Sequence, residues 1–222
     1  MERIVAASRN RNKIREIGRI TGKFGIEIIS RDDAGVPKTE IEEDGTTFEE
    51  NSYKKAFEIM KLCGMPTLAD DSGIEVDCIG KAPGVYSARF AQPEVSETGE
   101  KAEDADAEMP TNDPQEIQDK LNNKKLISMI RDFSYEERRG RFVCVITMVW
   151  PDGRKLTARG EVEGHILLEE RGDGGFGYDP LFVPLGHNRT FAEMSSEEKN
   201  SMSHRGKALT ELARLLSAQY KK

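Results

Sequence analysis

The sequence predicts an α/β fold, because it opens with a β-α-β pattern and later contains a β-hairpin. Short apolar runs at residues 3–7 and 26–29 flank a helical pattern and indicate two strands of the parallel type. Segments 139–150 and 155–163 are separated by an Asp-Gly turn and indicate an antiparallel pair. Strands of both types, with helices between them, are therefore expected in one fold.

The first three elements follow from local signals. A polar turn after the first strand leads into a helix with apolar residues on one face: Ile14, Ile17 and Ile20. Thr47 or a neighbouring residue is expected to cap a second helix over about 48–63, which ends at Gly64-Met65-Pro66. A short strand is then expected at 67–70, stopping on two aspartates, with 74–79 as a further extended segment.

Two more helices are expected in the second half, at 115–131 and 203–220. The last helix has an apolar face that we expect to point inward: Leu209, Leu212, Leu215 and Leu216. Between the second and third helices, residues 94–114 are rich in acidic residues and proline and almost free of large apolar residues. Such a segment cannot bury enough surface to order itself, so we expect a flexible acidic insertion within a single domain spanning 1–222.

Composition excludes several classes of protein. The net charge of −7 argues against a partner that is a long nucleic acid, which needs clustered Lys and Arg. Three cysteines without CxxC spacing suggest reduced, mostly buried thiols. The most apolar stretch, 142–150, is too short to span a bilayer, and no secretory signal is visible. A soluble cytoplasmic protein is expected.

The turn at residues 8–13 (SRNRNK) is the first candidate site. A strand-to-helix turn presents free backbone N–H groups and the positive end of a helix dipole, which together can hold phosphate, and Lys13 adds a full charge. The alternative is an ordinary Asn-capped helix with a solvated lysine.

Asp70 and Asp71 form the second candidate site. Carboxylates at the end of an apolar strand suit Mg²⁺, which takes one or two of them together with substrate phosphates. Such a carboxylate can also accept a proton from an attacking water molecule. The alternative is an Asx turn before Gly73.

Two segments near the C-terminus complete the set. The glycine-rich run at 172–180 formally contains G-x-G-x-x-G, but it leads into Asp-Pro and does not open a helix, so it is not a dinucleotide fingerprint. We expect it to expose Phe176 and Tyr178 for stacking on a base, with burial of both rings in the core as the alternative. His204 and Arg205 open the last helix, where their side chains could donate hydrogen bonds to a base.

In order along the chain, these segments resemble the inosine triphosphate pyrophosphatase family, the dITP/XTP pyrophosphatases. The matching motifs are S/T-x-N-x-x-K at 8–13, Thr47-Phe48 with Asn51 and Lys55, ADDSG at 69–73, APGVYSARF at 82–90, GGFGYDP at 174–180, and Glu198-Lys199 with SHRG at 203–206. The motifs extend over the whole chain apart from the acidic insertion, which is longer than the family's usual connection. Arg9 stands where the family usually has a small residue.

The resemblance implies an elongated mixed β-sheet flanked by helices, in two lobes with the active site in the cleft between them, and a homodimer. It implies hydrolysis of non-standard purine nucleoside triphosphates (ITP, dITP, XTP) to the monophosphate and pyrophosphate, with Mg²⁺ as cofactor. The implied metal ligands are Glu42, Asp70 and Asp71, and the implied catalytic residues are Asp71 (the general base), Lys13 and Lys55. The implied substrate-binding residues are Ser8, Asn10, Lys13, Lys55 and Ser72 for the triphosphate, Phe176, Gly177, Tyr178 and Asp179 for the base and sugar, and Lys199, His204 and Arg205 for the base.

Two other functions use the same features. A nucleotide phosphatase would release orthophosphate from the same substrates with a similar carboxylate–metal pair. A non-catalytic nucleotide-binding regulator would bind tightly without turnover.

Overall fold

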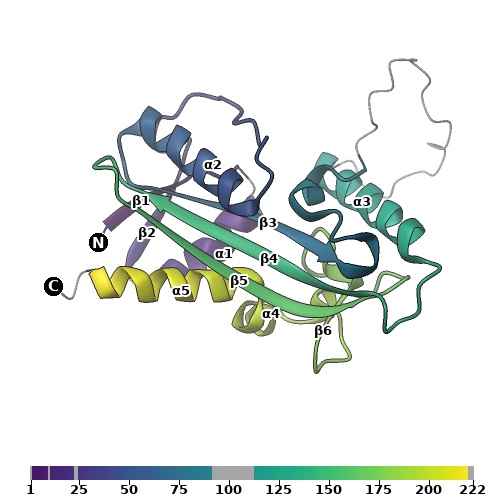
Figure 1. Ribbon diagram of the computed structural model, residues 1–222. Coiled ribbons are helices and arrows are strands. Elements are labelled where there is room, and N and C mark those ends of the chain that lie inside the picture. Colours follow the sequence, from purple (N-terminus) through teal and green to yellow (C-terminus); the bar gives the residue numbers. More distant parts are fainter. Residues whose placement is uncertain (1, 10, 23–24, 92–112, 220–222) are drawn as a thin grey trace, which may run out of the picture. The chain divides into compact units, whose positions relative to one another are not determined.

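The computed structural model describes residues 2–9, 11–22, 25–91 and 113–219 (Figure 1). Asn10 and all but the last two residues of the acidic insertion expected at 94–114 lie outside the described residues. In the part of the chain that is described, no helix combines the length and the apolar character needed to cross a membrane.

Six strands form one mixed sheet in the order β2-β1-β3-β4-β5-β6. The strands are β1 Glu2–Ala6, β2 Ile26–Ser30, β3 Thr67–Val76, β4 Arg139–Val149, β5 Lys155–Ile166 and β6 Phe182–Pro184. β1 pairs in parallel with β2 and β3, whereas β5 and β6 are antiparallel. The helices are α1 Arg11–Thr21, α2 Phe48–Cys63, α3 Pro114–Ile130, α4 Ser196–Met202 and α5 His204–Gln219. The predicted α/β class is confirmed.

The chain forms two compact units. The first comprises Met1–Gly73, Arg141–Val162 and Ser196–Lys222, and the second comprises Ile74–Gly140 and Glu163–Ser195. The first unit therefore contains α1, α2, α4 and α5, and the second contains α3 and β6.

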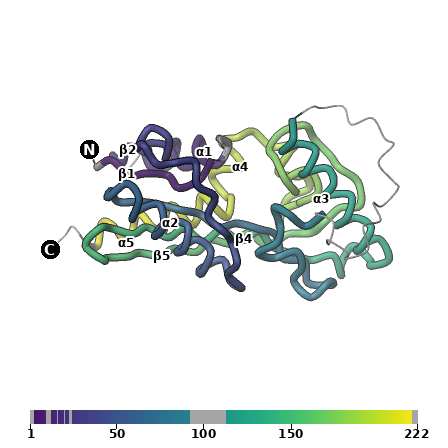
Figure 2. Tube along the Cα trace, turned by 90° about the horizontal axis from the view of Figure 1, so that it is seen from above, coloured from purple at the N-terminus to yellow at the C-terminus, as the bar shows by residue number. Residues whose placement is uncertain are grey.

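In the first unit, α5 runs along β4 and β5 in both views (Figures 1 and 2). Its predicted inward face packs into a cluster with the strands, in which Leu209, Leu212 and Leu216 are buried and Leu215 is partly buried. The start of α5 lies very close to β5, because a Cβ atom at Gly160 would collide with the backbone of His204 and Ala208. This close approach fixes the backbone position from which His204 and Arg205 extend.

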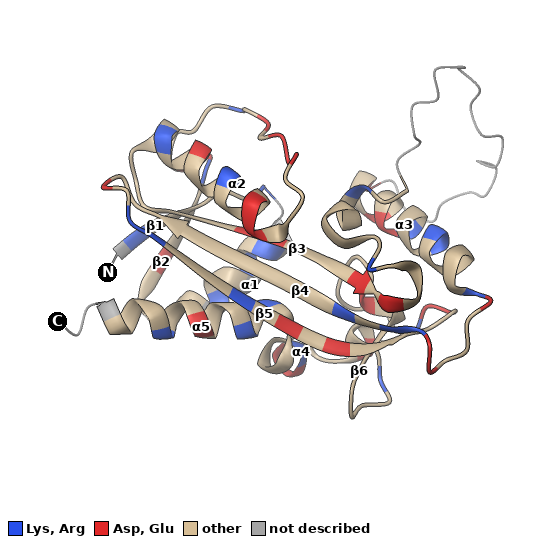
Figure 3. Ribbon diagram, in the orientation of Figure 1, with Lys and Arg blue, Asp and Glu red and all other residues tan. Residues whose placement is uncertain are grey.

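A second cluster joins α2 to β1 and β4 through Ala56, Ile59 and Met60. The predicted boundaries of α2 are confirmed, with a capping box between Thr47 and Glu50 at its start. Its lysines and acidic residues are drawn in blue and red on the ribbon, whereas β4 carries no charge along most of its length (Figure 3). β4 is accordingly buried over all but its first residues.

Two expectations about local structure are wrong. The chain does not break after Asp70 and Asp71, since β3 continues through both to Val76. Backbone pairing within the sheet has overridden the turn signal of Ser72-Gly73. The thiols are not mostly buried either: Cys144 is buried, but Cys63 and Cys78 are only partly so.

Candidate active site

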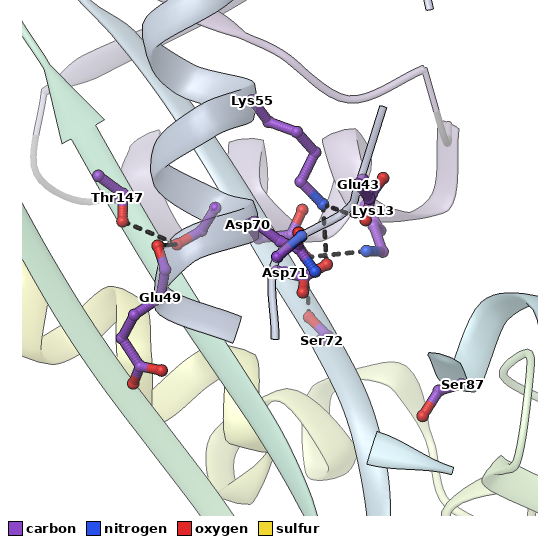
Figure 4. A network of polar contacts seen from close by, with 12 residues as sticks. Lys13, Glu43, Glu49, Lys55, Asp70, Asp71, Ser72, Ser87 and Thr147 are labelled. Atoms are coloured by element: carbon purple, nitrogen blue, oxygen red, sulfur yellow. Dashed lines mark hydrogen bonds and ion pairs between the residues drawn. The ribbon is translucent and has the colours of Figure 1, made fainter. Parts of the chain in front are cut away.

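Because Asp70 and Asp71 are consecutive residues of a strand, their side chains extend to opposite faces of the sheet. Each carboxylate therefore meets a different set of partners, although both are buried. In Figure 4 the labelled lysines converge on this pair. The structure thus assigns the two aspartates separate environments, which their adjacency in the sequence does not reveal.

Asp70 is neutralised by two cations. Its Oδ2 lies 3.2 Å from Lys13 Nζ and 3.2 Å from Arg205 Nη2, and it accepts a hydrogen bond of 2.9 Å from the Ser72 hydroxyl. Burial would raise the pKa of Asp70, but the positive charges of Lys13 and Arg205 outweigh it and hold this pKa well below its usual range. Asp70 is therefore a permanently charged centre that ties β3 to α1 and α5.

Asp71 faces α2 and the segment that precedes it. Lys55 Nζ lies 2.8 Å from Asp71 Oδ1 and 3.1 Å from Glu43 Oε2, so one ammonium group bridges two carboxylates. Burial raises the pKa of Asp71, and Lys55 offsets this only in part. For Glu43, burial is outweighed by the charge and hydrogen bond of Lys55, together with a side-chain hydrogen bond involving Asp71, and the pKa is lowered. Asp71 is thus the better proton acceptor of the two near neutral pH.

Contacts between its loop and α2 hold Glu43 in position. Lys55 holds Glu43, Lys54 holds Asp44 at 2.6 Å, and Asn51 Oδ1 accepts the Gly45 N–H at 2.8 Å. The loop residues and their helix partners run in opposite directions, so the loop lies antiparallel to the first turns of α2. A Cβ atom at Gly45 would overlap the Asn51 side chain, which explains the glycine.

Glu43 is a carboxylate of this cluster that the sequence analysis did not name. The resemblance implied Glu42 as a metal ligand, but its side chain is exposed, whereas that of Glu43 is half-buried beside Asp71. The two glutamates are adjacent in a loop without helix or strand, where no periodicity shows which side chain points inward. The consecutive acids at 43–44 and lysines at 54–55 were the available signal.

The carboxylates around Asp71 fit a hard cation such as Mg²⁺. Two carboxyl groups in contact repel one another when both are ionised, and a divalent cation removes that conflict. Within the described residues, Asp71 Oδ2 and Asp70 Oδ1 are buried without a hydrogen-bond partner. No group of three or more His, Cys, Asp or Glu among those residues is arranged as a metal site, so substrate oxygens would have to complete the coordination.

The predicted phosphate turn is only partly described. Lys13 lies in the first turn of α1, and its side chain is 19% exposed, so it retains access to solvent beside Asp70. Ser8 is partly buried just after β1. Asn10 stays a prediction, because it lies outside the described residues.

His204 and Arg205 are buried where α5 begins. The His204 ring stacks on Phe142 with centroids 4.8 Å apart, and burial, followed by the charge of Arg205, holds its pKa well below the usual range. The ring is therefore neutral, with one nitrogen that donates and one that accepts. Arg205 Nη2 donates to Asp70 and, at 3.3 Å, to Ser72, so at least one of its donors serves the carboxylate. Lys199 is also buried.

The glycine-rich loop belongs to the second unit, and the expectation that it exposes both aromatic rings is wrong for Tyr178. Tyr178 is 5% exposed, and its hydroxyl donates to the Ser87 carbonyl oxygen at 2.8 Å. A buried phenol needs such a partner, which makes Tyr178 part of the core. Phe176 is half-buried, and its backbone N–H donates to Asp179 Oδ2 at 2.8 Å.

Comparison with known proteins identifies the family. The model of the Ham1 family matches residues 4–215. The chain belongs to the Ham1 family. A dITP/XTP pyrophosphatase of Syntrophobacter fumaroxidans is 44% identical to this chain, and the match covers 95% of this chain and 80% of that protein. One of Desulforamulus reducens is 42% identical over 98% of this chain and 97% of that protein.

Solved structures agree with the Ham1 assignment. The Ham1 protein of Staphylococcus aureus superposes with a TM-score of 0.78 at 33% identity, covering 98% of this chain and 100% of that one. A nucleoside-triphosphatase (dITP/XTP pyrophosphatase) of Mycobacterium abscessus has a TM-score of 0.69 at 37% identity, covering 95% and 98%. The family resemblance drawn from the sequence motifs is thereby confirmed.

Proposed function

We propose that this protein hydrolyses non-standard purine nucleoside triphosphates such as ITP, dITP and XTP to the monophosphate and pyrophosphate. The observation that carries the proposal is the cluster in which Lys13 and Lys55 lie against Asp70 and Asp71, with Glu43 beside them. Cations for phosphate, a buried carboxylate with a raised pKa and a carboxylate pair for a metal are the parts that phosphoryl chemistry requires. The pyrophosphatase names of the relatives support the same reaction.

In the proposed reaction, water attacks the α-phosphorus and the bond to the bridging oxygen of pyrophosphate breaks. Asp71 accepts the proton of the water, a role that its raised pKa supports. Lys13 and Lys55 neutralise the phosphate oxygens, and their side chains are 19% and 15% exposed. Ser8, Asn10 and Ser72 would add hydrogen bonds to the triphosphate.

Magnesium would be held by Glu43 and Asp71, with Glu43 in place of the Glu42 that the motif suggested. The ion would supply charge neutralisation on the phosphates. Asp70, which the resemblance also implied as a metal ligand, is already paired with Lys13 and Arg205 on the opposite face of the strand, so its role toward the metal stays a prediction. The homodimer and the cytoplasmic location implied by the resemblance remain predictions.

Base selection is proposed to depend on hydrogen-bond donors at the start of α5. Hypoxanthine and xanthine carry an acceptor oxygen at C6, where adenine carries an amino donor. His204 Nδ1 is buried without a hydrogen-bond partner among the described residues and is a donor in the tautomer that carries the proton on this nitrogen, whereas Lys199 and Arg205 can only donate. Adenine would leave such donors unpaired, so we expect kcat/KM for ATP to be at least about 10²-fold below that for ITP. Guanine shares the C6 oxygen, so GTP must be distinguished by its 2-amino group.

The test is kcat/KM for ITP and ATP at matched Mg²⁺ in wild type and His204→Phe. This variant keeps a ring to stack on Phe142 but removes the nitrogens, and we expect about 10-fold lower kcat/KM for ITP and a smaller effect on ATP. His165→Phe is the matched control, since His165 also stacks on an aromatic ring, Tyr135, in the second unit. Equal losses for ITP and ATP in His204→Phe would show that His204 does not read the base.

A further inference from the structure

Two side chains of helix α3 form hydrogen bonds with the backbone of Gly177 in the glycine-rich loop. The Gly177 N–H donates to Asp119 Oδ2 at 2.8 Å, and the Gly177 carbonyl oxygen accepts from Asn123 Nδ2 at 3.1 Å. Asp119 and Asn123 are four residues apart, so they lie on the same face of α3. Both polar groups of this glycine are therefore satisfied by one helix, through side chains that neither the motifs nor the reaction assigned.

The same helix also holds the chain that leads into the loop. Asn123 Nδ2 donates to Glu170 Oε1 at 2.7 Å, and the Asn123 side chain is only 3% exposed. Its neighbour Asn122 donates to the carbonyl oxygen of Ser87, which also accepts the Tyr178 hydroxyl. Contacts to α3 thus flank the loop, and they come from buried or half-buried side chains.

Other backbone N–H groups of the loop are also hydrogen-bonded to the protein. Phe176 N–H is bound to Asp179 Oδ2, and Gly174 N–H donates to the Ala192 carbonyl oxygen at 3.0 Å. With the Gly177 N–H bound to Asp119, three of the loop's backbone donors are directed to protein acceptors. A phosphate cradle needs those donors free, so the loop is better suited to presenting Phe176 than to binding phosphate.

A glycine has wide conformational freedom, and Gly177 has a φ of 63°, in the left-handed region. Fixing such a residue costs conformational entropy, which external hydrogen bonds must offset. When these bonds form before the ligand arrives, the ligand no longer bears that cost and binds more tightly.

We propose that Asp119 and Asn123 are positioning residues that set the conformation of Gly177 and thereby the place of the Phe176 ring. This inference rests on the proposed function and on the role in holding the base and sugar that the family resemblance implies for this loop. Asp119 and Asn123 act on substrate affinity through the loop and take no part in the chemical step.

The experiment compares Asp119→Ala with Asp119→Asn and with Glu116→Ala. The amide oxygen of Asn can still accept the Gly177 N–H, whereas Glu116 is an exposed carboxylate on the same helix. For Asp119→Ala we expect KM for ITP to rise about 10-fold and kcat to stay within a few-fold. Asp119→Asn should recover most of the affinity, and Glu116→Ala should match wild type.

A second readout needs no turnover. Amide hydrogen exchange of the peptide covering 172–180 should be about 10-fold or more faster in Asp119→Ala and near wild type in Asp119→Asn, because a bound N–H exchanges only when it opens. If Asp119→Ala does not fold, Asp119→Glu replaces it, since this variant keeps the charge but displaces the carboxylate.

Unchanged exchange in Asp119→Ala would overturn the positioning role. A loss of kcat with KM unchanged would also contradict it. Failure of the proposed function would instead appear in wild type, as an absence of pyrophosphate release from ITP, so the two failures are distinguishable.

Discussion

Asp71→Asn is expected to lower kcat for ITP hydrolysis by about 10²-fold or more while the protein stays folded. The amide has nearly the shape of the carboxylate and can still accept the hydrogen bond from Lys55, so the packing around β3 is preserved. It cannot accept a proton from water, and it is a poor partner for a metal shared with Glu43. The substitution is therefore expected to slow the chemical step without unfolding the protein.

Steady-state kinetics at saturating Mg²⁺, together with thermal unfolding, measure this effect. Asp152→Asn is the control, because Asp152 lies in the exposed hairpin turn of the same unit and pairs only with Arg154 in the contacts described. Turnover within a few-fold of wild type in a well-folded Asp71→Asn protein would remove Asp71 from the mechanism.

Asp70→Ala is expected to destabilise the protein by about 3–5 kcal/mol, the usual result of removing one member of a buried ion pair. The substitution leaves the Arg205 guanidinium, which is 2% exposed, and the Lys13 ammonium without their shared carboxylate. Two like charges then face one another where their counter-charge had been. Most of the lost stability comes from leaving these cations without a counter-charge, and less comes from losing the ion pair itself.

Urea unfolding followed by circular dichroism gives this free-energy difference. Asp152→Ala serves as the control, since it removes an exposed ion pair, and exposed pairs contribute little. If Asp70→Ala unfolds at the same urea concentration as the control, Asp70 is not the structural centre of the cluster.

The sequence predicted those elements whose signals are local. α2 begins and ends where its N-cap and its Gly64 indicated, and the leucines of α5 point inward as expected. β3 was predicted as two pieces because Ser72-Gly73 reads as a turn, whereas pairing with its neighbours keeps the strand continuous. Pairing with distant strands is not encoded in the local pattern.

For the candidate site, the sequence identified the aspartates but not the division between them. That division follows from strand geometry, which places one carboxylate beside Lys13 and Arg205 and the other beside Lys55. Glu43 was missed because it lies in an irregular loop, and Tyr178 was expected to be exposed because a glycine-rich segment suggests an open loop. Both depend on contacts with residues far away in the chain.

The most direct test of the proposed function is to identify the products formed from ITP. The protein is incubated with ITP and Mg²⁺, and pyrophosphate, orthophosphate and the nucleotide product are quantified separately, with a sample lacking Mg²⁺ as the control. We expect one pyrophosphate and one IMP for each ITP consumed, and little product without the metal. Release of orthophosphate with formation of IDP would indicate a phosphatase, and binding of ITP without any product would indicate a non-catalytic regulator; either result would contradict the proposed function.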